Sequence, residues 1–151
     1  MSNILTIKTV QITPFRVLMM ALKDILLETN ITFTNNGIKI INMDKSHTVL
    51  VHTFLEAANF EFYECTKAKI LIGVNMLHLF RLINSIDNND TLTIYIEKED
   101  YYDGVVSYLG LKFENGDIKQ CKIQKLGLIE PYEEEPESEI ENVMKNKEEI
   151  S

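Results

Sequence analysis

The sequence predicts an α+β fold in which two helices pack together on curved antiparallel sheet. Most of the chain alternates between apolar and polar residues, which is typical of half-buried strands, and this alternation defines about nine segments. Two other segments carry apolar residues at helical spacing. Two helices are too few to cover both faces of so many strands, so we expect both on one face.

The first half of the chain is predicted to form a strand, a helix and three strands. A strand is expected over 4–12, followed by Thr13 as a helix cap and Pro14 at the first helical position. The helix should span 15–28. Its apolar side is formed by Phe15, Leu18, Leu22, Ile25 and Leu26. Three strands are expected at 31–34, 38–43 and 48–54, and the pair Asn36-Gly37 indicates a hairpin between the first two.

The second half repeats this order of elements. Strands are expected at 60–64 and 69–73, and a helix at 75–86 with Leu79, Phe80, Leu82 and Ile83 as its apolar side. Further strands are expected at 91–97, 105–113 and 118–125, the last two joined at Asn115-Gly116. The halves share a strand-helix-three-strand pattern without obvious sequence identity, which indicates a weak internal repeat.

Charge is distributed unevenly and separates two regions. Residues 130–151 hold nine Glu and two Lys, a net charge of −7, and the whole chain carries −8, so residues 1–129 carry −1. The acidic, proline-bearing segment is typical of a linker or tail. We therefore expect one domain over 1–129 and, over 130–151, an acidic connector or tail, or the start of a second domain. A nearly neutral body still allows a local basic face.

Several classes of site have no support in the sequence. Cys65 and Cys121 accompany no CxxC motif or His cluster, so we expect free thiols, no structural zinc and no cofactor. Asp44, Ser46 and His47 are close in sequence, but catalytic triads are assembled in space, and no nucleophile elbow or phosphate loop is present. We therefore expect no enzyme. Without a long apolar run or secretory signal, we expect a protein inside the cell with no membrane partner.

A positively charged helix face is the candidate binding surface. Arg16 and Lys23, seven residues apart, lie on one side of the first helix, and Arg81 lies on the polar side of the second. If both helices pack on one sheet, these polar sides point the same way. Such a face suits contact with phosphates, although exposed Lys and Arg are also ordinary solvated residues.

Several segments, in order and at matching distances, resemble the eukaryotic sliding clamp family, that of proliferating cell nuclear antigen. The most specific is Met43-Asp44-Lys45-Ser46-His47, followed by alternating apolar residues up to Val51. The other matching segments are 21–24, 37–38, 73–75 and 126–128. The resemblance covers roughly residues 4–130 and implies the DNA-clamp, or processivity, fold.

The resemblance also implies a function. Family protomers have two similar domains, and three protomers close a ring around duplex DNA without reading its sequence. The ring holds DNA polymerase and other replication and repair proteins on DNA, works with a clamp loader, and has no catalytic step. Its members act in the nucleus or, for a virus, in the replication compartment. Since the strand before the connector lies at the family's subunit interface, the segment 105–125 should contain that edge here.

The resemblance assigns roles to individual residues. Arg16, Lys23 and Arg81 match positions that face DNA, whereas Val17 and Asn84 stand where the family has lysines, so the wall is less basic than in the family. A pocket for partner peptides is the second implied site. Its matching residues are Met43, His47, Leu50, Leu126 and Leu128.

Two interpretations are open for the extent of the chain, and a second function is open beside the clamp. It is either a truncated clamp or a divergent single-domain relative, of viral origin or from a damage-response ring. A second function is a clamp-derived scaffold or transcription accessory factor that no longer encircles DNA. The acidic tail and the thinned basic wall favour this alternative, whereas retention of Lys23 and Arg81 disfavours it.

Overall fold

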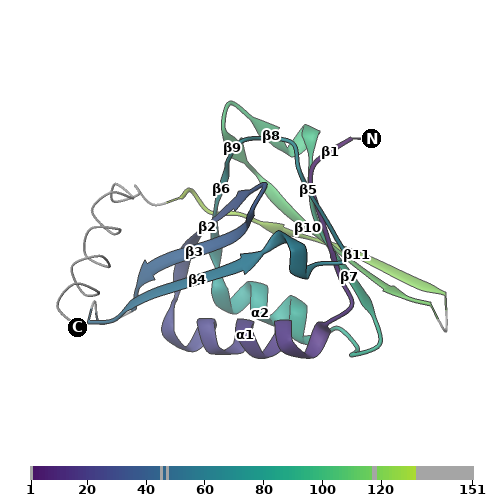
Figure 1. Ribbon diagram of the computed structural model, residues 1–151, viewed down its shortest axis with the longest axis horizontal. Helices are drawn as coiled ribbons and strands as arrows, with labels where there is room; N and C mark the ends of the chain where they lie inside the picture. The colour runs from purple at the N-terminus through teal and green to yellow at the C-terminus, as the bar shows by residue number, and fades with distance from the viewer. Residues whose placement is uncertain (1, 45, 47, 117–118, 132–151) are drawn as a thin grey trace.

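The computed structural model describes residues 2–44, 46, 48–116 and 119–131. Within them, two main antiparallel sheets pack against each other, and two helices lie side by side along one side of both sheets (Figure 1). This arrangement confirms the predicted α+β class. Neither helix combines the length and the apolarity that crossing a membrane requires, as judged on the described residues.

In the part of the chain that the structure describes, the strands form three antiparallel sheets. The five-stranded sheet has the order β11 (Gln120–Gly127), β10 (Tyr108–Asn115), β7 (Thr91–Glu97), β1 (Asn3–Thr9) and β5 (Phe62–Cys65). The four-stranded sheet has the order β4 (Leu50–Glu56), β3 (Gly37–Met43), β2 (Glu28–Thr34) and β6 (Ile70–Asn75). A small hairpin pairs β8 (Tyr101–Tyr102) with β9 (Val105–Val106). The helices are α1 (Ile12–Ile25) and α2 (Met76–Asn84), with 3₁₀ turns η1 (Ala57–Asn59) and η2 (Lys98–Asp100).

The two halves of the chain exchange their first strands. The first half contributes β1, α1, β2, β3 and β4, and the second contributes β6, α2, β7, β10 and β11. However, β1 pairs with β7, in the sheet of the second half, and β6 pairs with β2, in the sheet of the first half. Each sheet therefore contains strands from both halves, and neither half completes a sheet on its own.

The core lies between the two sheets and above the helices. It is built from alternate residues of the strands, as the sequence pattern predicts. Among those at most 1% exposed are Leu5, Ile7, Ile40, Ile70, Ile72, Leu92, Ile96 and Leu111. Burying a side chain of this size contributes roughly 1.5–3 kcal/mol each before the cost of ordering the chain.

The helices bury one face each against the sheets. The buried residues are Ile12, Met19 and Leu22 of α1 and Met76, Leu79 and Ile83 of α2. In contrast to the sequence prediction, Ile25 is 39% exposed. The apolar side of α1 is thus rotated from the predicted one, toward Met19.

The ends of α1 differ from the prediction. The N-cap is Gln11, which makes no side-chain cap bond, so Thr13 and Pro14 lie inside the first turn. Proline is tolerated there because the first N–H groups of a helix have no intrahelical partner. The helix also ends at Ile25, three residues early. Leu26 is extended, so that Glu28 can pair with Asn75 in the adjoining strand β6.

In the other elements, the predicted and the observed boundaries differ only locally. The helix α2 begins one residue after Asn75, whose side-chain oxygen accepts a hydrogen bond from the His78 N–H at 3.1 Å and caps the helix. The strand predicted over 105–113 is broken into β9 and β10. The hairpin of β8 and β9 was not predicted, although Asp103-Gly104, with φ of 51° and 81°, is a typical two-residue turn.

Gly37 is required where β3 passes β4. Its φ is 150°, and a Cβ at this position would lie 2.1 Å from the carbonyl oxygen of Leu55. We expect Gly37→Ala to lower the free energy of unfolding by about 1–3 kcal/mol, because both the backbone conformation and the contact become strained. Chemical denaturation measures this change. Gly116→Ala, which also follows an Asn, is the control, since nothing lies within 4 Å of its Cβ position. Equal effects at the two glycines would contradict this account.

Candidate functional site

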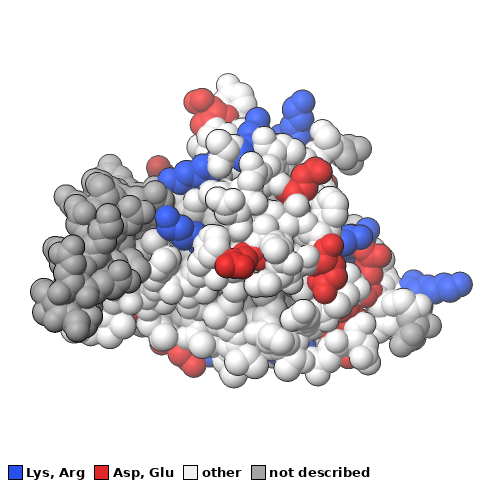
Figure 2. Space-filling model, in the orientation of Figure 1, with Lys and Arg blue, Asp and Glu red and all other residues white. Residues whose placement is uncertain are grey.

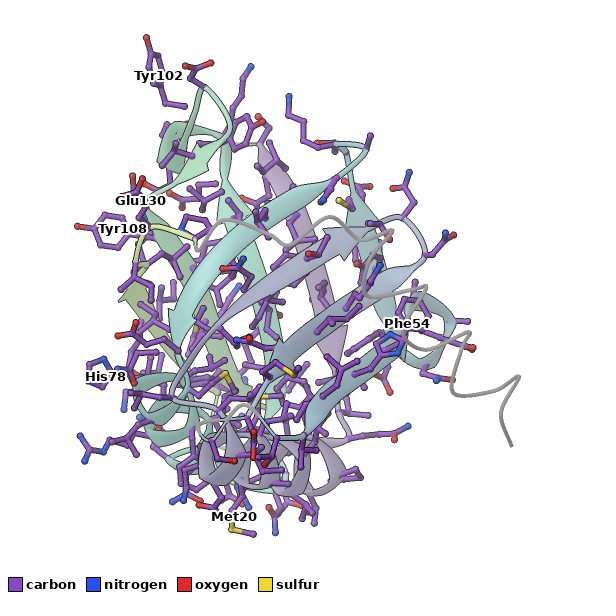
Figure 3. All side chains as sticks on the ribbon, turned by 90° about the vertical axis from the view of Figure 1, so that its left-hand side faces the viewer. Met20, Phe54, His78, Tyr102, Tyr108 and Glu130 are labelled. Atoms are coloured by element: carbon purple, nitrogen blue, oxygen red, sulfur yellow. The ribbon has the colours of Figure 1, made fainter. Side chains whose placement is uncertain are left out.

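The two helices run antiparallel, and both helices that carry the predicted basic residues lie on one side of the molecule. Arg16, near the start of α1, contacts the segment that follows α2, and Lys23, near the end of α1, lies over Phe80 in the middle of α2. Met20 on α1 points away from the sheets on this side (Figure 3). The outward surface of the helix pair is therefore the surface that the sequence assigns to phosphate contact.

Arg16 is held by the protein itself. One of its guanidinium nitrogens, Nη1, donates to Asn88 Oδ1 at 2.6 Å, and the other, Nη2, donates to the carbonyl oxygen of Ile86. Its Nε is buried and has no hydrogen-bond partner among the described residues. The guanidinium thus lies against the end of α2 rather than extending into solvent.

Lys23 is also partly engaged. Its Nζ lies 2.7 Å from Asp24 Oδ1 and 4.9 Å from the centroid of the Phe80 ring, and its side chain is 23% exposed. An ion pair at the surface contributes little to stability, and a cation over an aromatic ring about 0.5–1 kcal/mol. The positive charge of Lys23 remains at the surface, next to one neutralising carboxylate.

Arg81 is the most accessible of the three. It is exposed in the last turn of α2, and its guanidinium has no hydrogen-bond or ion-pair partner among the described residues. Two outward positions of α1 are uncharged, with Val17 53% and Met20 44% exposed, and Asp24 adds a negative charge there. The helix face is therefore only weakly positive, and of its three predicted basic residues Arg81 provides the most exposed charge.

The predicted peptide pocket falls on the outer face of the four-stranded sheet. Met43 pairs with Leu50, and directly paired residues of an antiparallel ladder share a face. Ile38 and Ile40 are buried, so Met43, at the alternate position, points outward and is 43% exposed. Leu50 lies beside it. His47, the third predicted member on this side, lies outside the described residues.

On the connector side of this surface, the structure adds a residue to the predicted pair. Leu126 is only 8% exposed and Leu128 packs against the core, so both side chains contribute to the core at the start of the connector. Ile129 instead pairs with Gly73 of β6, and Ile129 and Pro131 cover the side of Gly73 that faces away from its buried neighbours Ile72 and Val74. Ile129 was not singled out from the sequence because its orientation depends on this pairing with β6, which no local pattern reports.

The loop between β3 and β4 is organised by Asp44. Its Oδ1 accepts hydrogen bonds from the N–H groups of Thr48 and Val49, at 2.9 and 3.1 Å, and its Oδ2 accepts one from the Ser46 hydroxyl at 2.8 Å. These donors, Ser46 first, lower the pKa of the Asp44 carboxyl below its ordinary value. The acid, hydroxyl and loop therefore form a structural turn.

Charge elsewhere on the surface is mixed. Acidic and basic residues are interspersed on the face seen in Figure 2, and neither kind gathers into a large patch. Among the described residues, no group of three or more His, Cys, Asp or Glu side chains is placed to hold a metal ion.

Comparison with known proteins identifies the family. The model of the proliferating cell nuclear antigen N-terminal domain matches residues 4–131. The chain therefore belongs to this family, as the resemblance in its sequence indicated.

Individual relatives agree with this assignment. A probable DNA polymerase sliding clamp of Acanthamoeba polyphaga mimivirus is 30% identical over 106 residues, which cover 70% of this chain and 23% of that protein. Proliferating cell nuclear antigen of Chaetomium thermophilum is 32% identical over 122 residues, covering 79% of this chain and 44% of that protein. The chain thus spans less than half the length of these two relatives.

A solved structure supports the fold. The crystal structure of proliferating cell nuclear antigen from Entamoeba histolytica superimposes with a TM-score of 0.78 at 23% identity, covering 88% of this chain and 50% of that one. The predicted clamp fold, with two helices on antiparallel sheets, is confirmed.

The Asp44 turn predicts a pH-dependent loop. Because hydrogen bonds in the folded state lower its pKa, the turn should be fully formed above 3.8, the ordinary value, and be lost as the pH falls through the lower folded value. An NMR titration of the Thr48 and Val49 amides should therefore give a midpoint below 3.8. Asp44→Asn should abolish that titration. A midpoint at or above the ordinary value would contradict the assigned hydrogen bonds.

Proposed function

We propose that this chain is a domain of a DNA sliding clamp, a ring that surrounds duplex DNA and keeps DNA polymerase and other replication and repair proteins attached to it. The observation that carries this proposal is the pair of helices on one side of two sheets, with the charge of Arg81 exposed, in a member of this family. The clamp acts by enclosing DNA, and the proposal contains no catalytic step and no cofactor.

A weakly positive helix wall suits sliding. Contacts to phosphates carry no sequence information, and each one is weak and exchanged easily at physiological salt. Lys23 and Arg81 would contribute such contacts from α1 and α2. Arg16 would add positive potential, although its guanidinium hydrogen-bonds to the protein. Uncharged neighbours such as Val17 add no attraction to phosphate, so the DNA is not held in one place.

Two terminal strands support assembly. Among the described residues, β11 ends the five-stranded sheet and β4 ends the four-stranded sheet. A terminal strand has unpaired N–H and C=O groups along one side and can pair with another domain. Because β11 and β4 belong to different sheets, pairing one with the other in a neighbouring domain is a head-to-tail contact, which forms a ring when the rotation closes. We propose three protomers per ring if each has a second domain.

The outer surface is proposed to bind clamp-dependent proteins. Met43 and Leu50 offer apolar side chains on the outer face of the four-stranded sheet, and Ile129 lies on the same face. A short peptide with apolar anchors is the kind of partner that such a surface recognises. We retain His47, Leu126 and Leu128 as proposed members. The clients would include DNA polymerase and a clamp loader, in the nucleus or in a viral replication compartment.

The DNA-facing assignment predicts a specific salt effect. Arg81→Gln should reduce the slope of log K against log salt for duplex DNA by about one unit for each phosphate that the variant no longer neutralises. Fluorescence anisotropy across a salt series measures this slope. Because Arg81 is exposed and without a described partner, the melting temperature should not change.

A lysine far from the helices provides the matched control. Lys98 is exposed in η2, next to β8, on the side of the molecule away from the helices (Figure 1). Lys98→Gln removes the same charge but should leave the salt slope unchanged. Equal slopes for the two variants would mean that the helix face does not contact DNA.

A further inference from the structure

We propose that Arg16 is a positioning residue that ties the start of α1 to the end of α2, and that it does not act as a phosphate ligand. By holding the segment that directly follows α2, it fixes the position of the end of that helix and thereby the orientation of Arg81. The consequence for Arg81 depends on the proposed function, whereas the tie between the helices does not.

The contacts of Arg16 join distant parts of the chain. Its two terminal nitrogens donate to Ile86 and Asn88, which are 70 and 72 residues away in sequence. Both acceptors lie in the segment between α2 and β7. Arg16 is only partly exposed, and its Nε is buried. A phosphate would have to compete with two hydrogen bonds that the protein already supplies.

The Arg16 guanidinium lies just beyond the end of α2, two residues after Asn84. The last carbonyl groups of a helix have no intrahelical partner, and a cation near them is favoured by the helix dipole. The Ser85 hydroxyl donates to the carbonyl of Leu82 at 2.7 Å, and the Arg16 guanidinium donates to the carbonyl of Ile86. The hydroxyl thus serves a carbonyl of the helix itself, and the guanidinium places a positive charge just beyond the helix end.

The turn after α2 is held by the same guanidinium. Within it, the Asp87 N–H donates to Asp90 Oδ2 at 3.2 Å, and the Asn89 N–H donates to Asp87 Oδ1 at 3.3 Å. These bonds order the turn internally but do not connect it to α1. The bond from Arg16 to Asn88 makes that connection at 2.6 Å. At its own start, α1 has no side-chain cap, so Arg16 is also an anchor for its first turns.

An arginine is needed for this geometry. Its planar guanidinium presents several N–H groups in a fixed fork and can reach two acceptors at once, whereas a lysine carries a single compact charge on a flexible stem. A phosphate ligand could be either residue, because both supply a positive charge. Arg16→Lys therefore separates the two roles.

The decisive experiment compares Arg16→Lys and Arg16→Gln in the full chain. If Arg16 positions the helices, both variants should lower the melting temperature by about 4 °C or more and increase amide hydrogen exchange at residues 85–90. If Arg16 is a phosphate ligand, Arg16→Lys should match the wild-type chain in both measurements. That second result would overturn the proposal.

A milder variant tests the proposal even if the Arg16 variants do not fold. Asn88→Ala removes only one of the two acceptors, and its effect on the melting temperature should be smaller than that of Arg16→Gln. Combining the two should add less than the sum of the single effects, because both remove the same bond. Simple additivity would overturn the proposal. A wild-type chain that shows no salt-dependent DNA association would refute the proposed function but leave these stability results intact.

Discussion

The exchange of first strands between the two halves is the constraint on which the rest of the structure depends. Because β1 completes the sheet of the second half and β6 that of the first, the core cannot form until both halves are present. The same exchange places both helices on one side of both sheets, since each helix follows directly from an exchanged strand. It also leaves the last strand of each half, β4 and β11, at the end of its sheet. A helix face and two sheet edges thus follow from one feature of the topology.

Much of the local structure could be predicted because local patterns determine it. Alternation located the strands, and the spacing of Leu79 and Ile83 located α2. The boundaries of α1 could not be predicted in the same way. Leu26 and Leu27 extend the apolar pattern of α1, yet the chain becomes extended at Leu26 so that β2 can pair with β6. Pairing between strands distant in sequence prevails there over helical propensity, and a single sequence does not report that pairing.

In the candidate site, too, some features depend on local sequence and others on contacts between distant parts of the chain. The sequence placed Arg16, Lys23 and Arg81 on two helices and predicted a common side, and the structure has both helices on one side of the two sheets. The sequence could not show that the three side chains have different hydrogen-bond partners, because the acceptors of the Arg16 guanidinium lie 70 and 72 residues away. Likewise, the position of Ile129 over Gly73 depends on its pairing with β6. Residue type and periodicity predict which element carries a side chain, whereas its partners depend on the topology.

Retention on DNA of different topology tests the central claim most directly. The assembled protein, formed by this chain or by a longer product that contains it, would be loaded on closed circular duplex DNA and washed at salt high enough to screen phosphate contacts. A ring held by topology should stay on the intact circle and be released once the DNA is cut and its ends are open. Equal release from circular and linear DNA would contradict encirclement and would favour a scaffold that has kept the clamp fold without its ring.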